Sequence, residues 1–156
     1  MSAGRTYTVL FRSVAITAAQ DLCAAYAGAN MALEVVSFTI GQDTQNSVEL
    51  VPISIKLLTS AVTAGSGGSA FTPEPDTDTD AAATFTARIN DTTIATGGAT
   101  HYKHADMWNL VNGYPWIFPE RARPSCKPGE ALIFSLDGAP AASRTTSASF
   151  KLRELF

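Results

Sequence analysis

Residues 51–58 read VPISIKLL, and every second position carries a large aliphatic side chain: Val51, Ile53, Ile55 and Leu57. A period of two is typical of a β-strand that buries one face, because successive side chains point to opposite faces of a sheet. Pro52 has no amide hydrogen to donate. It therefore predicts that this strand lies at a sheet edge or contains a bulge.

The same alternation recurs along most of the chain. In each further strand, the residues expected to share one face are Tyr7, Val9 and Phe11; Glu34, Val36, Phe38 and Ile40; Phe85, Ala87 and Ile89; Tyr102, His104, Asp106, Trp108 and Leu110; Leu132, Phe134 and Leu136; and Ala148, Phe150 and Leu152. A shorter strand is expected at residues 116–118. The phase slips near Arg12–Ser13, which predicts a bulge. The pattern predicts an all-β protein, an antiparallel β-sandwich of the jelly-roll kind with about eight strands.

The length of 156 residues fits one domain spanning residues 1–156. We expect a short N-terminal arm over about residues 1–7, and a long loop over about residues 60–83 that projects from one end of the sandwich or reaches a neighbouring subunit. The alanine-rich stretch 18–29 fits a helix, and a short strand from Leu22 to Tyr26 is the alternative.

The charge balance argues against several kinds of partner. Net charge is −3, and no segment is rich in Lys and Arg, whereas binding nucleic acid needs clustered cations that displace counterions. No apolar run is long enough to cross a membrane, and no export signal is recognisable at the N-terminus. We therefore expect no nucleic-acid partner, no membrane partner and synthesis in the cytosol.

The residues that could bind a metal do not form a recognisable site. Asp76, Asp78 and Asp80 have the spacing that begins a calcium loop, but the Gly and Glu that complete an EF-hand loop are missing. Whether this loop binds an ion in another way is left open. His101 and His104 are expected on opposite faces of one strand, since three residues separate them. We expect no metal and no cofactor.

Covalent catalysis has no support either. Ser125 and Cys126 lack the glycines of a nucleophile elbow, and the glycine-rich run 65–69 lacks the Gly-Lys-Ser/Thr ending of a phosphate-binding loop. Cys23 and Cys126 are expected to be small buried thiols, and the sequence leaves their pairing open. We therefore expect a protein that is not an enzyme.

Aromatic residues cluster late in the chain, at Tyr102, Trp108, Tyr114, Trp116 and Phe118. Such a cluster suits the core, an interface between subunits, or a platform on which sugars stack. Because aromatic side chains are enriched at interfaces, we favour core and interface over sugar binding.

Four segments together resemble a known family: RTYTVLFRSVAITAAQDL at 5–22, FTARINDTTIATGGATHYKHADMWNLVNGY at 85–114, CKPGEALIFSLDGAP at 126–140 and SASFKLREL at 147–155. They are similar to small proteins encoded near the head genes of tailed bacteriophages, often described as capsid decoration (cement) proteins. The resemblance implies a β-sandwich or jelly roll, three copies of which form a knob on the outside of the expanded shell. The chain departs from the family in its Ala18–Ala29 segment and its acidic Asp76–Asp80 loop.

The resemblance implies a structural virion protein on the outer surface of the phage head, with the major capsid protein and its own copies, as a homotrimer, for partners. Because termini and long loops readily make contacts outside a core, we predict capsid contacts at Ser2, Arg5, Tyr7, Gly67, Phe71, Asp76 and Asp78. We predict a trimer interface at Tyr102, Trp108, Tyr114 and Trp116.

Two other classes of function stay open at this point. One is a carbohydrate- or receptor-binding domain of a phage tail appendage, which would use the same aromatic residues as stacking platforms. The other is a metal-dependent jelly-roll enzyme, which would contain stoichiometric metal.

Overall fold

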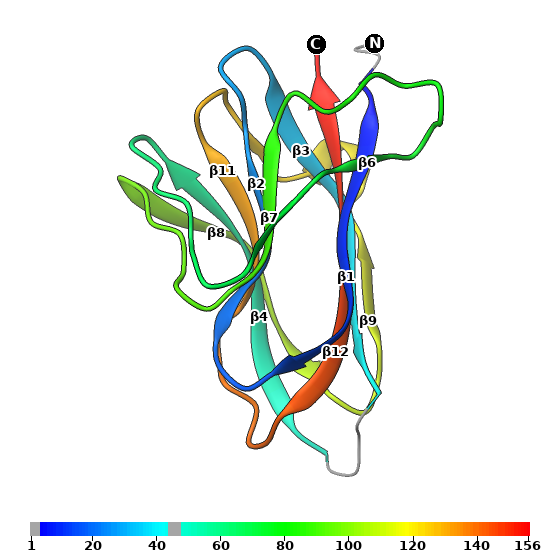
Figure 1. Cartoon of the computed structure of the whole chain (residues 1–156), viewed down its shortest axis with the longest axis vertical. Coiled ribbons are helices and arrows are strands. Elements are labelled where there is room, and N and C mark those ends of the chain that lie inside the picture. The colour runs from blue at the N-terminus through cyan, green and yellow to red at the C-terminus, as the bar shows by residue number, and fades with distance from the viewer. Residues whose placement is uncertain (1–3, 44–47) are drawn as a thin grey trace.

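The computed structural model describes residues 4–43 and 48–156 as two antiparallel β-sheets that pack face to face (Figure 1). This confirms the predicted all-β sandwich. Twelve strands lie within the described residues, together with one 3-10 turn, η1, at Glu120–Ala122. None of the helices in these two ranges is long and apolar enough for a membrane crossing.

The first sheet has the strand order β10-β3-β12-β1-β6, and β9 also pairs with β3. Its strands are β1 (Thr6–Ile16), β3 (Ala32–Gln42), β6 (Glu74–Pro75), β9 (Tyr114–Ile117), β10 (Ser125–Cys126) and β12 (Arg144–Leu155). The second sheet has the order β5-β7-β2-β11-β4-β8. Its strands are β2 (Gln20–Tyr26), β4 (Leu50–Thr59), β5 (Ser69–Phe71), β7 (Thr86–Asp91), β8 (Ala99–Asn109) and β11 (Ala131–Leu136).

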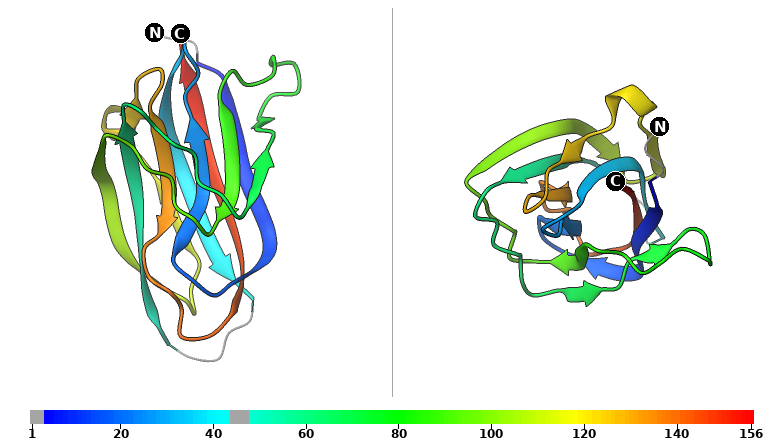
Figure 2. Two further views of the ribbon diagram at one scale, coloured as in Figure 1. Left: turned by 60° about the vertical axis from the view of Figure 1, so that its left-hand side comes forward. Right: turned by 90° about the horizontal axis from the view of Figure 1, so that it is seen from above.

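The two sheets face each other strand by strand, because β1 contacts β7, β12 contacts β2, and β3 contacts β11. The edge strands of the two sheets therefore lie along two sides of the sandwich, and these sides consist of different strands. On the side that we call the β8–β9 side, β8 ends the second sheet, while β9 and β10 end the first. On the opposite side, which we call the β5–β6 side, the sheets end in β5 and β6 (Figure 2).

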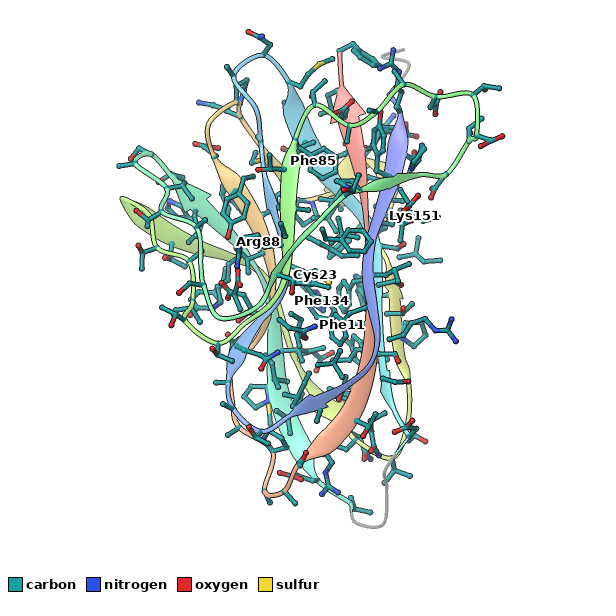
Figure 3. The ribbon with its side chains drawn as sticks, in the orientation of Figure 1. Phe11, Cys23, Phe85, Arg88, Phe134 and Lys151 are labelled. Carbon is teal, nitrogen blue, oxygen red and sulfur yellow. The ribbon has the colours of Figure 1, made fainter. Side chains whose placement is uncertain are left out.

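The core lies between the sheets and consists largely of the positions that alternation predicts. Phe134 of β11 packs against Phe38 of β3, with a ring-centroid distance of 4.6 Å, and against Phe150 of β12 at 6.1 Å. In Figure 3, Phe134 and Phe11 lie between the two sheets, whereas Lys151 lies on the outside of the first sheet. The predicted core faces of β1, β4, β11 and β12 are all buried.

Bulges change the facing of side chains in four strands, β1, β2, β3 and β8. The predicted bulge in β1 is confirmed, since its register with β12 shifts between Phe11 and Val14. A second bulge in β3 makes Val36 the extra residue, so that Leu33 and Val35 reach the core. The prediction that Glu34 and Val36 share a face with Phe38 and Ile40 is therefore wrong.

The alanine-rich stretch contains a strand, β2, and this confirms the second of the two alternatives. Small side chains suit this central strand because both of its faces are covered: Cys23 and Ala25 belong to the main core, whereas Ala24 packs in a smaller outer cluster. Burial on both faces, rather than intrinsic propensity, thus determines the structure here.

Pro52 lies neither on an edge strand nor in a bulge, because β4 has β8 on one side and β11 on the other. The amide of Asp137 donates to the carbonyl of Pro52 at 2.9 Å, just beyond Leu136, the last residue of β11 that pairs with β4. The nitrogen of Pro52, which carries no hydrogen, therefore faces only the end of β11. Only one ladder bond is lost, which makes the proline tolerable.

The expected long loop is more ordered than predicted, since it contains β5 and β6. Before β5, isolated bridges join Thr63 to Thr96 and Ser66 to Thr93, and they hold two loops over the outer face of the second sheet. Beneath these loops is the smaller apolar cluster, formed by Ala24, Leu58, Ala95, Ala131 and Ile133. Only the part that follows β6 projects from the sandwich, at the upper right of Figure 1.

Two buried carboxylates attach these loops to the sheet. Asp21 accepts a hydrogen bond from the amide of Ala95 at 2.7 Å, and Asp91 accepts one from the amide of Gly68 at 3.0 Å. Asp91 is also paired with Arg88, whereas Asp21 forms no ion pair within residues 4–43 and 48–156. Burial therefore raises the pKa of Asp21 from 3.8 to about 6, although the Ala95 amide and Lys56 oppose this shift.

We predict that Asp21 makes the protein less stable as the pH rises from 4 to about 6. The folded state binds this proton more tightly than the unfolded chain does, so the contribution of Asp21 to the free energy of unfolding falls over this range by up to about 3 kcal/mol. Asp21→Asn keeps an oxygen for the Ala95 amide but carries no charge. Urea denaturation at a series of pH values is expected to show a flatter pH dependence for this variant.

The matched control is Asp78→Asn, which removes the same charge from an exposed position. It should leave the pH dependence between 4 and 6 as it is in the natural chain. An unchanged pH dependence in Asp21→Asn would contradict the proposed role of its burial.

Candidate functional site

Most of the exposed large apolar side chains belong to the strands that end the β8–β9 side. Nine large hydrophobic residues are exposed in the described part of the chain. Six of them belong to β8, to β9, to the turn that joins them, or to the end of β4 beside β8: Leu50, Tyr102, Met107, Val111, Trp116 and Ile117. The other three are Val48, Ile94 and Phe156. The six face in different directions: Tyr102 and Met107 lie opposite Lys56 and Pro52 on the outer face of the second sheet, Ile117 lies opposite Ser37 on the outer face of the first, and Trp116 faces His104 across the edge. Exposed apolar groups on neighbouring strands mark surfaces that bind other molecules.

The rings of β9 close the gap between the two sheets on this side. Trp116 lies 4.8 Å from the ring of His104 on β8, and Tyr114 stacks on Phe38 at 5.8 Å with only 12° between the planes. Phe118 contacts both Phe38 and His104. The two edge strands do not pair with each other, so side chains rather than a backbone ladder join the sheets here.

A hydrogen bond between side chains strengthens this closure. The hydroxyl of Tyr114 donates to the carboxylate of Asp106, and burial together with this carboxylate raises the pKa of Tyr114 to about 12. The same hydrogen bond lowers the pKa of Asp106, while burial lowers the pKa of His104. At neutral pH the group therefore consists of a neutral tyrosine, a charged carboxylate and a neutral imidazole, an arrangement suited to holding rings in place.

The backbone edge of β8 is protected against pairing with another strand. Lys103 is the extra residue of a bulge, because β4 pairs with His104 and then with Tyr102. Asp106 accepts a hydrogen bond from the amide of Met107 at 2.7 Å. The amide of Leu110 donates to the carbonyl of Glu49, next to β4. Because successive amides along a strand point to opposite edges, the amide of Met107 points to the open edge of β8. A bulge, a lysine and an occupied amide all discourage sheet extension, so the side chains remain as the binding elements.

The same bulge overturns a prediction about the two histidines. His101 lies opposite Leu57 and His104 lies opposite Ile55, and these two β4 residues both face the core. Both histidines therefore point to the same face of β8, not to opposite faces. Across residues 4–43 and 48–156 there is still no group of three or more His, Cys, Asp or Glu side chains placed to hold a metal ion.

The predicted trimer residues fall into three environments. Tyr102 is 63% exposed and lies over Lys56, whose ammonium is 5.8 Å from the ring centroid. Trp116 is 39% exposed, and Tyr114 is partly buried beneath it. Trp108 is only 2% exposed, and its indole nitrogen donates to the carbonyl of Asn112 at 2.8 Å. The prediction is wrong for Trp108, because this side chain is part of the core and fixes the turn after β8.

The predicted capsid contacts in the N-terminal arm are only partly accessible. Ser2 lies outside the described residues. Tyr7 is fully buried in β1, and its hydroxyl donates to the carbonyl of Ala81 at 2.8 Å, so the prediction is wrong for Tyr7. The guanidinium of Arg5 lies over the ring of Phe156, at 5.1 Å from the centroid.

The predicted capsid contacts in the long loop also differ from one another. Phe71 is partly buried and packs against the main core. Asp76 is bound by Lys151 at 2.9 Å and by the Thr8 hydroxyl at 2.8 Å. Gly67 and Asp78 are exposed, and Gly67 has a φ of +92°, a conformation that favours glycine.

The two cysteines are both buried and free, so they do not form a disulfide. Burial raises the pKa of Cys126 to about 12 and raises the pKa of Cys23 as well. Neither thiol is therefore a ready nucleophile at neutral pH.

Comparison of the chain with protein-family models, with curated proteins and with solved structures gave no match. The sequence does not predict the exposure of Met107, Val111 and Ile117 on these strands. The sequence does contain a sign that β8 is an edge strand, because polar His104 and Asp106 occupy positions that a central strand would fill with apolar residues.

We predict that the two tryptophans contribute very differently to stability. Trp108→Ala should lower the free energy of unfolding by about 3–5 kcal/mol, because it removes a buried ring and leaves a cavity. Trp116→Ala should lower it by about 1 kcal/mol or less, because that ring is largely at the surface. Urea denaturation of the two variants compares them directly, and equal losses would contradict the assigned environments.

Proposed function

We propose that this chain is a structural, non-enzymatic protein of a tailed-bacteriophage particle. In this proposal it is a capsid decoration (cement) protein that binds the outside of the head as a homotrimer. The observation that supports it best is the β8–β9 side, where exposed Tyr102, Trp116 and Ile117 lie on a firmly packed scaffold. Large rigid rings at a surface suit contact between proteins. The family resemblance supports the same function, and it also implies that the strands are connected as in a jelly roll.

The proposed mechanism involves no covalent chemistry. A trimer that binds only the expanded shell stabilises that state, because ligand binding to one state shifts the equilibrium towards it. Three identical contacts on one trimer also act together, so that weak individual contacts give stable attachment.

We propose that the end of the sandwich carrying Arg5 and Phe156 faces the capsid. Both described chain ends lie there, at the top of Figure 1 and of the left view in Figure 2. Phe156 is 57% exposed and Arg5 lies over its ring, so this end offers an apolar group and a cation together. Such a pair suits a partner surface that has both apolar and acidic groups.

Co-sedimentation with phage heads tests this function. Purified protein is mixed with expanded heads and, separately, with unexpanded heads of a tailed phage that carries this gene, and the heads are pelleted. We expect the protein to pellet with expanded heads and to raise the temperature at which they break open. Arg5→Glu should weaken this binding, and Arg12→Glu, an equal charge change on an exposed β1 residue, should not. A protein that stays in solution with both kinds of head would refute the proposal.

A second candidate function is carbohydrate binding in a tail appendage. The exposed ring of Trp116, with polar His104 and Asp106 nearby, is the observation that favours it. If this function is correct, the isolated protein binds glycans, and Trp116→Ala and Tyr102→Ala abolish the binding while the fold remains intact. Screening against immobilised glycans decides between the two functions, since a decoration protein should give no glycan signal that depends on Trp116.

A further inference from the structure

A cleft of about 420 Å³ opens at one end of the β8–β9 side, between β4 and β8 of the second sheet and β3 and β10 of the first. Its lining includes Leu57, His101, Lys103, Cys126, Lys127 and Leu155. The cleft thus combines apolar walls with two lysines and a histidine. This combination suits an acidic segment that also has small apolar side chains.

The lysines of this cleft are available to a ligand. In the described ranges, neither Lys103 nor Lys127 forms an ion pair within the chain. The one acidic residue in the lining, Glu130, accepts a hydrogen bond from the amide of Lys127 at 2.9 Å. The two ammonium groups therefore outnumber the single carboxylate, and the cleft favours an anionic group.

An acidic loop, residues 76–84, projects from the opposite, β5–β6 side. It is anchored at its start, where Lys151 binds Asp76, and at its end, where Glu154 accepts two hydrogen bonds from Thr84, at 2.6 and 2.7 Å. Between these anchors, Asp78 and Asp80 form no ion pair within the described residues. A loop held at both ends loses little conformational entropy when it binds.

We propose that the acidic loop of one copy docks into the basic cleft of a second copy. The inference rests on the homotrimer of the proposed function and names one of its contacts. Asp78 and Asp80 would lie against Lys103 and Lys127, while the exposed Ala81 and Ala82 would meet the apolar walls. The opposite charges of the two surfaces are the reason for choosing a second copy as the occupant.

The positions of loop and cleft agree with a closed ring. In Figure 1 the loop extends to the upper right while β8 lies to the left, so each copy carries the two surfaces on opposite sides. A contact between two different surfaces repeats from copy to copy and closes into a ring if the rotation allows it. A three-membered ring requires a contact of this kind.

Charge reversal tests the contact in the full chain. Lys103→Glu, Lys127→Glu and the double variant Asp78→Lys/Asp80→Lys should each raise the dissociation constant of the oligomer about tenfold or more. Analytical ultracentrifugation and light scattering measure this constant. The combined variant with all four changes should regain the association, because its loop is basic and its cleft acidic. Arg12→Glu is the matched control, and an equal loss in this control would overturn the inference.

Zero-length cross-linking between carboxylates and amines provides an independent test. An equal mixture of isotopically labelled and unlabelled protein is treated with a carbodiimide and analysed by mass spectrometry. We expect mixed-label links that join Asp78 or Asp80 to Lys103 or Lys127. An oligomer whose mixed-label links all lie elsewhere would overturn the loop-in-cleft contact.

The outcomes separate this inference from the proposed function. If the protein binds expanded heads as a trimer but the charge reversals leave the dissociation constant of the oligomer unchanged, the loop-in-cleft contact is wrong and the decoration function stands. If the natural chain stays monomeric at tens of micromolar, both the contact and the trimer are wrong. Association that depends on the charges, with cross-links at the named residues, supports the contact even if heads are not bound.

Discussion

The packing of Phe38 against Phe134 is the contact on which the rest of the structure depends. The two rings join β3 of the first sheet to β11 of the second, and their centroids are 4.6 Å apart. Phe38 also contacts Tyr114, Phe118 and His104, so the same ring that joins the sheets supports the residues that close the β8–β9 side. The candidate interaction surface is therefore an outward extension of the core.

This origin explains why the surface can be both apolar and well defined. Apolar side chains on mobile loops lose entropy when they bind, whereas rings already packed against a core lose little. At the same time, the bulge at Lys103 and the occupied amide of Met107 protect the backbone edge of β8 from indiscriminate pairing. Recognition on this side is thus left to side chains, whose shape and charge can select a partner.

The sequence predicted the fold class and most core positions, because alternation with a period of two survives wherever a strand pairs without interruption. It failed where pairing is interrupted. The bulges at Val36 and Lys103 reverse the facing of side chains, and neither residue differs in type from its neighbours in a way that marks a bulge. Strand β2 was also uncertain, since its alanines are explained only by burial on both faces.

The candidate site was predicted in part. Tyr114 and Trp116 lie together on β9, but Tyr102 is on the outer face of β8 and Trp108 is buried, and exposure of an aromatic residue cannot be read from its type. The basic cleft was not foreseen, because Lys103 and Lys127 are brought together only by the packing of β8 near β10. Local patterns predicted the strands, whereas the meeting of distant strands determines the surface.

The chain has two tryptophans, and their different exposure provides a direct measurement of whether the β8–β9 side binds another copy. Trp108 is shielded at 2% exposure and Trp116 is accessible at 39%, so iodide quenching of fluorescence reports chiefly on Trp116. If this side is the interface, the quenchable fraction falls as the protein concentration is raised from nanomolar to tens of micromolar. Quenching that stays the same over this range, in a protein that does associate, would show that the β8–β9 side remains exposed and that its rings serve another purpose.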